Sequence, residues 1–251
     1  MERTLIKKKN IDKIAESYLR LQTPKENRSN IICFFLILLY LIGLLPIVAV
    51  PFSLSYFIAA IIPVGIVQLW AIIYLIDPYK NEKSYYLFFG IYGVVNTYIY
   101  FLAIQKMIYL NMGAKGSGPL VIGVLFFIAL LIGMNWLNWK ALYTGTYYKL
   151  QQKNSISVTW SVVGGAGYVL GQLILSFIYT DSAVFILMIV CISLLSIFTA
   201  FCSIFIHRYY YICKNINLVK QMYPEFGKPL SERYSKKKKR KKKHSTRNII
   251  R

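Results

Sequence analysis

The chain has 251 residues, of which 57% are hydrophobic and 16% aromatic, and it carries a formal net charge of +21. A soluble domain needs a largely polar surface, so this composition excludes an ordinary soluble protein and predicts an all-α, polytopic membrane protein. Only ten charged residues fall between Ile31 and His207, namely Asp77, Lys80, Glu82, Lys83, Lys106, Lys115, Lys140, Lys149, Lys153 and Asp181.

Six apolar runs are long enough to cross a bilayer, for which about 20 residues suffice. The predicted transmembrane helices run from about Ile31 to Val50, Leu54 to Ile76, Tyr85 to Leu110, Pro119 to Tyr143, Val158 to Tyr179 and Ala183 to Ile212. They divide the chain into an N-terminal segment (1–30), a membrane domain (31–212) and a C-terminal tail (213–251). Because residues 1–30 are polar, no cleavable signal peptide is expected.

Lysine and arginine residues collect on one side of this predicted six-helix bundle. The N-terminal segment holds eight and the segment from Arg208 holds fifteen, while the connectors after the second and fourth spans add five. The other connectors contain only Lys115. Cytoplasmic flanks retain positive charge, so we predict a multi-pass cell-membrane protein with both termini in the cytoplasm. The abundance of Ile, Lys, Tyr and Asn is typical of an AT-rich genome and suggests a bacterial source.

Both ends of the chain carry short amphipathic patterns. From Asn10 to the breaking pair Thr23-Pro24, apolar residues recur at helical spacing: Ile11, Ile14, Ala15, Tyr18 and Leu19. This helix either senses or recruits a partner, or anchors itself under the bundle; we favour the anchor. A weaker repeat from Ile216 to Tyr223 precedes a tail that we interpret as mostly disordered.

The tail contains eight consecutive cations, Lys236, Lys237, Lys238, Lys239, Arg240, Lys241, Lys242 and Lys243. Such a run repels itself and is attracted to the anionic lipids of the inner leaflet, which is the partner we favour. Nucleic acid, a ribosome, a nuclear-import receptor or another acidic partner would offer similar negative charge.

Inside the predicted spans there is no Asp or Glu, which disfavours transport coupled through a buried carboxylate. Lys106 is interpreted as a side chain that reaches the outer interface. Four uncharged residues form a possible intramembrane polar site: Asn96, Thr97, Asn135 and Asn138. Asn135 and Asn138 are three residues apart and therefore share one side of a helix. They could line a polar passage, bind a lipid headgroup or form interhelical hydrogen bonds, and we favour the hydrogen bonds.

Gly167 and Gly171 form a small-xxx-small pair in the predicted fifth span. Such a pair lets a second helix approach closely, either from the same chain or from a membrane-protein partner.

Enzymatic function is not expected. The chain has two histidines and four cysteines without paired metal-binding spacing, and it lacks a phosphate-binding glycine loop and a serine elbow. The sequence therefore predicts no catalytic residue, no cofactor and no metal site.

The leading interpretation is a non-enzymatic membrane protein that acts through protein or lipid contacts in the bilayer. Examples are an accessory subunit of a secretion or export assembly and a toxin-immunity protein. The alternative is a transporter or channel for a neutral or anionic solute. An insertase-like role is a third class, but it lacks the buried cation expected of a hydrophilic groove.

Overall fold

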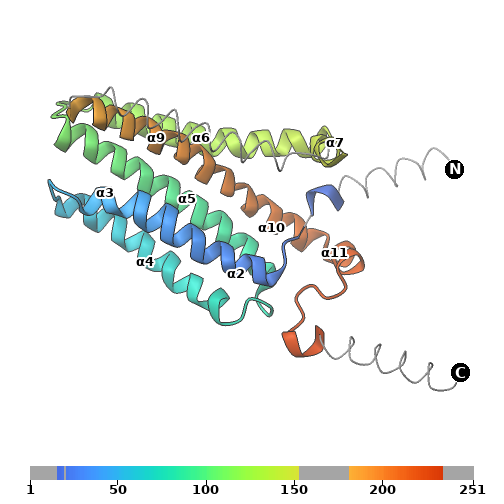
Figure 1. Ribbon diagram of the computed structural model, residues 1–251. Helices are drawn as coiled ribbons and strands as arrows, with labels where there is room; N and C mark the ends of the chain where they lie inside the picture. The colour runs from blue at the N-terminus through green and yellow to red at the C-terminus, as the bar shows by residue number, and fades with distance from the viewer. Residues whose placement is uncertain (1–15, 20, 153–180, 234–251) are drawn as a thin grey trace, which may run out of the picture.

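The computed structural model describes residues 16–19, 21–152 and 181–233, which form helices and no strands (Figure 1). Five helical stretches are long and apolar enough to cross a membrane: Pro24–Val48, Leu54–Ile76, Glu82–Asn111, Gly118–Tyr143 and Ser182–Lys214. They correspond to the first four predicted spans and the sixth. The predicted fifth span with Gly167 and Gly171, the cations Lys236–Lys243, and residues 10–15 of the predicted N-terminal helix lie outside the described residues.

The first span consists of α2 (Pro24–Cys33), the π-helical stretch η1 (Phe34–Leu44) and the short α3 (Leu45–Val48). It begins at Pro24 rather than near Ile31 because Thr23 and Glu26 form a capping box. The Glu26 carboxylate accepts from the Thr23 amide at 2.8 Å, and the Thr23 hydroxyl accepts from the Glu26 amide. The Thr23-Pro24 pair therefore starts a helix as well as ending the segment before it.

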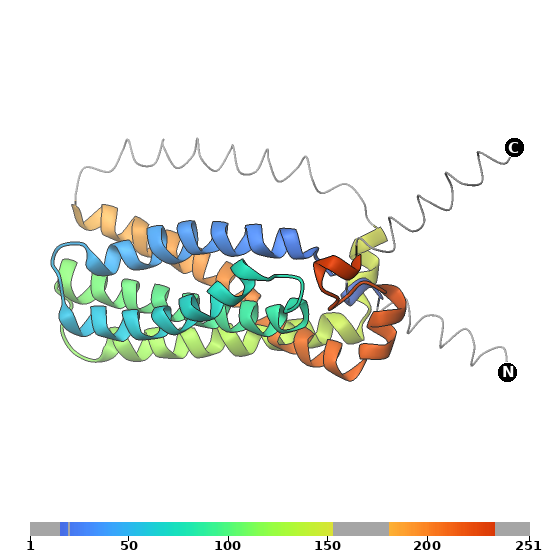
Figure 2. The same cartoon turned by 90° about the horizontal axis from the view of Figure 1, so that it is seen from below.

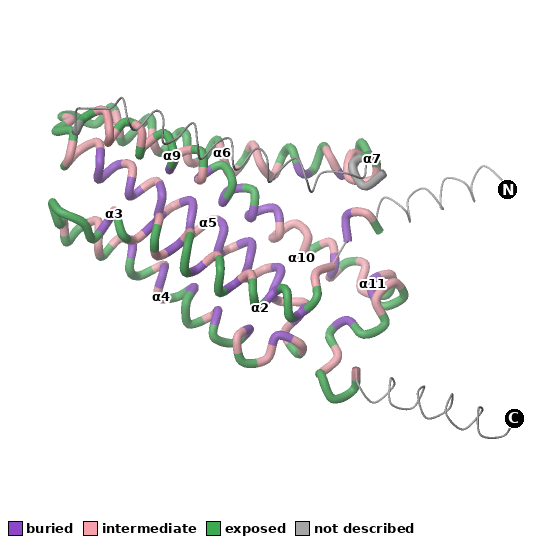
Figure 3. Tube along the Cα trace, in the orientation of Figure 1, coloured by how far each residue is buried: buried purple, intermediate pink, exposed green. Residues whose placement is uncertain are grey.

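Helix α5 (Glu82–Lys106), continued by η2 (Met107–Asn111), lies at the centre of the bundle. It packs against the first span, α4 (Leu54–Ile76), α6 (Gly118–Tyr143), α9 (Asp181–Cys202) and α10 (Ile204–Lys214), and it carries more buried positions than any other described element (Figures 1 and 3). The outer faces of α4 and α6 instead expose large aliphatic side chains. Such apolar surfaces suit a lipid environment.

Two glycines let α5 and the last span approach closely. A Cβ added at Gly93 would lie 2.5 Å from Cys202 Cβ, and one added at Gly90 would lie 2.5 Å from Ile206 Cγ1. Both distances are too short for any other residue. Gly90 and Gly93 are three residues apart on one side of the helix, a spacing that could have been recognised in the sequence.

The elements have defined directions. Helices α6 and α9 both run antiparallel to α5, so they are parallel to each other (Figures 1 and 2). Residues 16–19, α7 (Thr146–Gln152) and α11 (Ile216–Met222) lie together at one end, which we call the terminal end. The α3–α4 and η2–α6 connectors lie at the opposite end, the far end.

Residues 224–233, here called the C-terminal hook, fold back onto the start of α5. The Glu82 carboxylate accepts from the Gly227 amide at 2.9 Å and forms an ion pair with Arg233. The Arg233 guanidinium also lies 5.1 Å from the centre of the Tyr79 ring, and Phe226 is buried. The chain is thus folded as far as Arg233, further than the sequence indicated.

Candidate functional site

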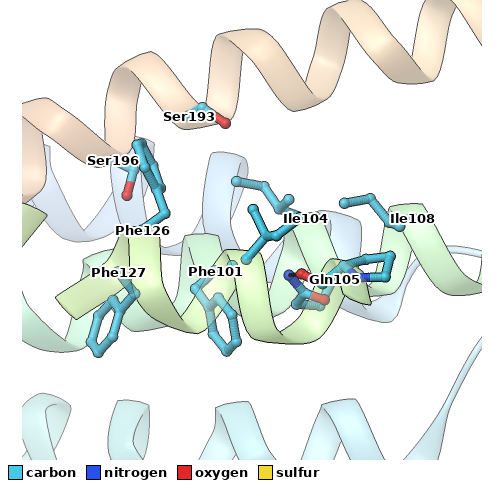
Figure 4. Close-up of a pocket in the computed structure, with 11 residues that line it drawn as sticks. Phe101, Ile104, Gln105, Ile108, Phe126, Phe127, Ser193 and Ser196 are labelled. Atoms are coloured by element: carbon cyan, nitrogen blue, oxygen red, sulfur yellow. Dashed lines mark hydrogen bonds between the residues drawn. The ribbon is translucent and has the colours of Figure 1, made fainter. Parts of the chain in front are cut away.

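A lateral groove of about 370 Å³ opens in the side of the bundle between α5, α6 and α9 (Figure 4). It is lined by Phe101, Ile104, Gln105, Ile108, Pro119, Ile122, Gly123, Phe126, Phe127, Ser193 and Ser196. Ile122 and Phe126 are also exposed on the outer surface of α6. Among the described residues the groove therefore offers mainly apolar contacts, next to an exposed apolar face of α6.

Gln105 supplies a polar atom to this groove. Its amide nitrogen donates to the Pro119 carbonyl at 3.2 Å and so holds the start of α6 against α5. A Cβ added at Gly123 would lie 2.1 Å from that nitrogen, so a larger residue there would displace the amide from this position. The amide oxygen of Gln105 is buried and accepts no hydrogen bond from the described residues. It remains an acceptor for a ligand that carries a donor.

The α9 wall of the groove carries the hydroxyls of Ser193 and Ser196, opposite Ile104 and Ile108 in Figure 4. The sequence prediction did not assign either serine or Gln105 to a site. A weak signal was present, because Gln105 interrupts an apolar run and the two serines are three residues apart in another.

Of the predicted polar residues, Thr97 links helices. Its hydroxyl donates to the Gly93 carbonyl at 2.8 Å and lies 2.9 Å from the Thr199 hydroxyl of α9. All three residues lie at the close contact between α5 and the last span. Thr97 is thus explained by packing between helices.

Asn96, unlike Thr97, forms no side-chain hydrogen bond with the described residues. Its side chain is completely buried, and neither the amide nitrogen nor the amide oxygen has a hydrogen-bond partner among the described residues. A buried amide without partners costs about 1–3 kcal/mol. Asn96 therefore retains unused capacity to bind a polar group in the middle of the bundle.

Asn135 and Asn138 form hydrogen bonds in two different parts of the bundle. Asn135 donates to the Ser203 hydroxyl at 2.9 Å, which lies at the break between α9 and α10. Asn138 belongs to a hydrogen-bonded chain at the terminal end. Both make the interhelical contacts that the sequence favoured, and they do not form one polar site with Asn96 and Thr97.

The chain of hydrogen bonds at the terminal end joins four segments. The Tyr147 hydroxyl donates to Asn138 Oδ1 at 2.6 Å, and Asn138 Nδ2 donates to the Tyr18 hydroxyl oxygen at 3.3 Å. The Tyr18 hydroxyl lies 2.7 Å from His207 Nδ1. Burial raises the pKa of Tyr18 from its ordinary value of about 10 to about 12, although the bond from Asn138 opposes this shift. This cluster fastens residues 16–19 beneath the bundle.

Arg208 completes the cluster. Its guanidinium lies 5.3 Å from the centre of the Tyr18 ring and 4.8 Å from that of Phe205, as expected for cation–π contacts. Its Nε is buried without a hydrogen-bond partner. In the described ranges the only carboxylate–cation pair is Glu82–Arg233, so Arg208 is held by aromatic rings rather than by an acid.

Lys106 lies inside the protein at the end of the first span, and its predicted reach to the outer interface stays a prediction. It is buried, and its ammonium donates to the carbonyls of Pro46 at 2.8 Å and Ile47 at 2.9 Å, and also to that of Ala49. These carbonyls lie at the end of the first span, where helical partners are lacking. The sequence cannot reveal this role, because it does not show where the first span ends relative to α5.

Two tyrosines of α5 bind the same span closer to the terminal end. The Tyr92 hydroxyl donates to the Phe34 carbonyl at 2.9 Å, and the Tyr100 hydroxyl donates to the Leu38 carbonyl at 3.0 Å. Both acceptors belong to the π-helical stretch. Together with Lys106, these donors join α5 to the first span along its length.

The chain matches no protein-family model, no curated protein and no solved structure. Across residues 16–19, 21–152 and 181–233, no group of three or more His, Cys, Asp or Glu could hold a metal ion. Functional inference therefore rests on the geometry of the chain itself.

Proposed function

We propose that this chain is a non-enzymatic integral membrane protein that acts through protein or lipid contacts within the bilayer. An accessory subunit of a secretion or export assembly and a toxin-immunity protein are both roles of this kind. The lateral groove carries the proposal, because it opens sideways between α5, α6 and α9 and is bordered by the exposed apolar surface of α6. A binding surface in that position meets molecules in the membrane.

The chemistry of the groove supports an apolar occupant with a small polar group. Its walls are mostly aromatic and aliphatic, while Gln105, Ser193 and Ser196 supply an acceptor and hydroxyls. A transmembrane helix or an acyl chain fits such a surface, and the polar atoms would orient it.

A photo-crosslinking experiment tests the groove. A photoreactive phenylalanine replaces Ile122, which is 69% exposed beside the groove, or Leu69, which is 70% exposed on α4 away from it. We expect a discrete adduct with a membrane protein or lipid from position 122 and only diffuse labelling from position 69. An adduct that maps to residues 153–180 of the same chain, or equal labelling at both positions, would overturn the groove as a partner site.

The proposal includes six spans with both termini on the cytoplasmic side of a cell membrane. Because α6 and α9 run in the same direction, residues 153–180 must return from the terminal end to the far end. These 28 residues would extend about 42 Å as a helix, enough to cross the bilayer core of about 30 Å. The cationic segments at the terminal end support its cytoplasmic location.

Cysteine labelling tests this topology. In a background without native cysteines, Lys115→Cys places a thiol in the η2–α6 connector and Lys214→Cys places one at the terminal end. On intact cells, a membrane-impermeant maleimide is expected to label position 115 and to leave position 214 unlabelled. The reverse pattern would contradict the proposed orientation.

A second candidate function is transport of a neutral or anionic solute. The specific observation in its favour is Asn96, whose buried amide has two unused polar atoms in the middle of the bundle. Purified protein in liposomes would be assayed for efflux of a loaded mixture of sugars, polyols and organic anions. Efflux that Asn96→Leu abolishes, with unchanged folding, would favour transport over the contact function.

A further inference from the structure

A second groove, of about 680 Å³, lies at the terminal end, away from the lateral groove. Three segments line it: Lys25 and Arg28 from α2, residues 76–79 at the end of α4, and residues 229–231 of the C-terminal hook. Figure 1 shows these segments meeting at the same end of the bundle. The groove therefore lies where the polar end of the molecule meets its apolar helices.

The hook wall of this groove is fixed in place. Glu82 binds both the Gly227 amide and Arg233, and the Arg233 guanidinium lies over the Tyr79 ring. The same arginine donates from Nε to the Lys228 carbonyl at 2.9 Å. These contacts set residues 229–231 opposite α2, so the cavity has walls built by tertiary structure.

The charge of the groove is positive. Lys25 and Arg28 are exposed, and neither forms an ion pair within the described ranges. The single acid in the lining, Asp77, accepts from the amides of Tyr79 and Lys80 at 3.1 Å each. The lining thus holds the two cations Lys25 and Arg28 and the Asp77 carboxylate, one oxygen of which already accepts two backbone hydrogen bonds. A ligand with one negative charge would neutralise the site.

The position of the groove indicates where that ligand comes from. Ile32 lies one helical turn beyond Arg28 and is 45% exposed, and Ile76, in the groove lining, is 78% exposed. Both lie on apolar helices long enough to span a membrane. The cations therefore stand at the level of lipid headgroups, with exposed aliphatic side chains on the bilayer side.

We infer that this groove binds the headgroup of an anionic phospholipid of the phosphatidylglycerol type. Its phosphate lies between Lys25 and Arg28, the glycerol hydroxyls donate to Asp77 and bind the Ser231 hydroxyl, and the acyl chains run past Ile32 and Ile76. This site is independent of the lateral groove and of the polybasic run Lys236–Lys243.

The test uses full-length protein that has been delipidated and titrated with phosphatidylglycerol or phosphatidylcholine, with bound lipid counted by native mass spectrometry. The double variant Lys25→Gln/Arg28→Gln removes both groove cations. The matched control Lys214→Gln/Lys220→Gln removes two exposed cations elsewhere at the terminal end. Because the tail is intact in all proteins, its own attraction for anionic lipid is the same in each.

We expect wild type to prefer phosphatidylglycerol, and the groove variant to bind it about thirtyfold more weakly, since each of the two lost cations removes about 1 kcal/mol. The control variant should change far less. A third variant, Ser231→Trp, keeps every charge but fills the groove, and it should lose the same preference. Equal losses in the two charge variants, or full binding by Ser231→Trp with an unchanged melting temperature, would overturn the site.

Discussion

The hydroxyl oxygen of Tyr18 lies 2.7 Å from Nδ1 of His207, although 189 residues separate them in the chain. This contact joins the segment before the first span to the end of the last span. The hydrogen bonds through Asn138 and Tyr147 extend the contact to α6 and α7. The segment before the first span and the end of the last span are therefore held together by one hydrogen-bonded cluster.

This cluster should weaken at alkaline pH. Burial raises the pKa of Tyr18 to about 12, so its stabilising contribution is complete below pH 10 and is lost as the pH rises towards 12. A shift of two pKa units corresponds to about 3 kcal/mol. Chemical unfolding in detergent at pH 9 and pH 11.5 should therefore show a larger loss for wild type than for Tyr18→Phe. Equal losses would contradict the role of Tyr18 as the titrating group.

Lys106→Met should destabilise the protein by about 3 kcal/mol, because the buried carbonyl of Ile47 and the partly buried carbonyls of Pro46 and Ala49 would lose their common donor. The measurement is the free energy of unfolding in detergent. Lys115→Met, at an exposed position in the η2–α6 connector, is the matched control and should leave stability unchanged. A neutral effect of Lys106→Met would show that these carbonyls do not need the ammonium.

Gly93→Ala should cost about 1–3 kcal/mol through overpacking, since the new Cβ would meet Cys202 Cβ at 2.5 Å and the Thr199 carbonyl at 2.8 Å. Gly65→Ala provides the comparison, because a Cβ at Gly65 meets nothing within 4 Å. That control is expected to be neutral or to stabilise α4 by up to about 1 kcal/mol. Thermal unfolding of both variants distinguishes close helix contact from a general intolerance of alanine.

Glu82→Gln should release the C-terminal hook. The change breaks a buried ion pair with Arg233, at a cost on the order of 3 kcal/mol, although the Gly227 amide keeps an acceptor. Hydrogen exchange of residues 224–233 should accelerate, while exchange within α5 stays slow. Glu225→Gln, at an exposed position in the hook, serves as the control. Unchanged exchange in Glu82→Gln would mean that other contacts hold the hook.

The sequence predicted the membrane helices well, because long apolar runs have few alternatives in a bilayer. The span from Leu54 to Ile76 has the predicted bounds. The helix that contains the first span begins before the predicted membrane boundary near Ile31, because α2 begins within polar residues, where a capping box rather than hydrophobicity decides the helix start. The predicted fifth span lies outside the described residues and stays a prediction.

The candidate sites were harder to predict, because they depend on contacts between distant segments. The cluster around Tyr18 and the hook around Glu82 join residues that no local pattern relates. The carbonyl partners of Lys106 were not predicted, because a lone lysine near a helix end has the same pattern whether it points to the interface or into the bundle. The lateral groove needs α5, α6 and α9 together, and in the sequence only Gln105 and the spacing of Ser193 and Ser196 indicated it weakly.

The donors on α5 also have a consequence for how the protein is made. Tyr92, Tyr100 and Lys106 all bind carbonyls of the first span, and Lys106 binds those of Pro46 and Ile47 at its end, where helical partners are lacking. Ribosomes synthesise the first span long before they reach these residues. The carbonyls at the end of the newly made span therefore gain the Lys106 ammonium only after the third span lies beside it. Until then these last carbonyls need water as their donor.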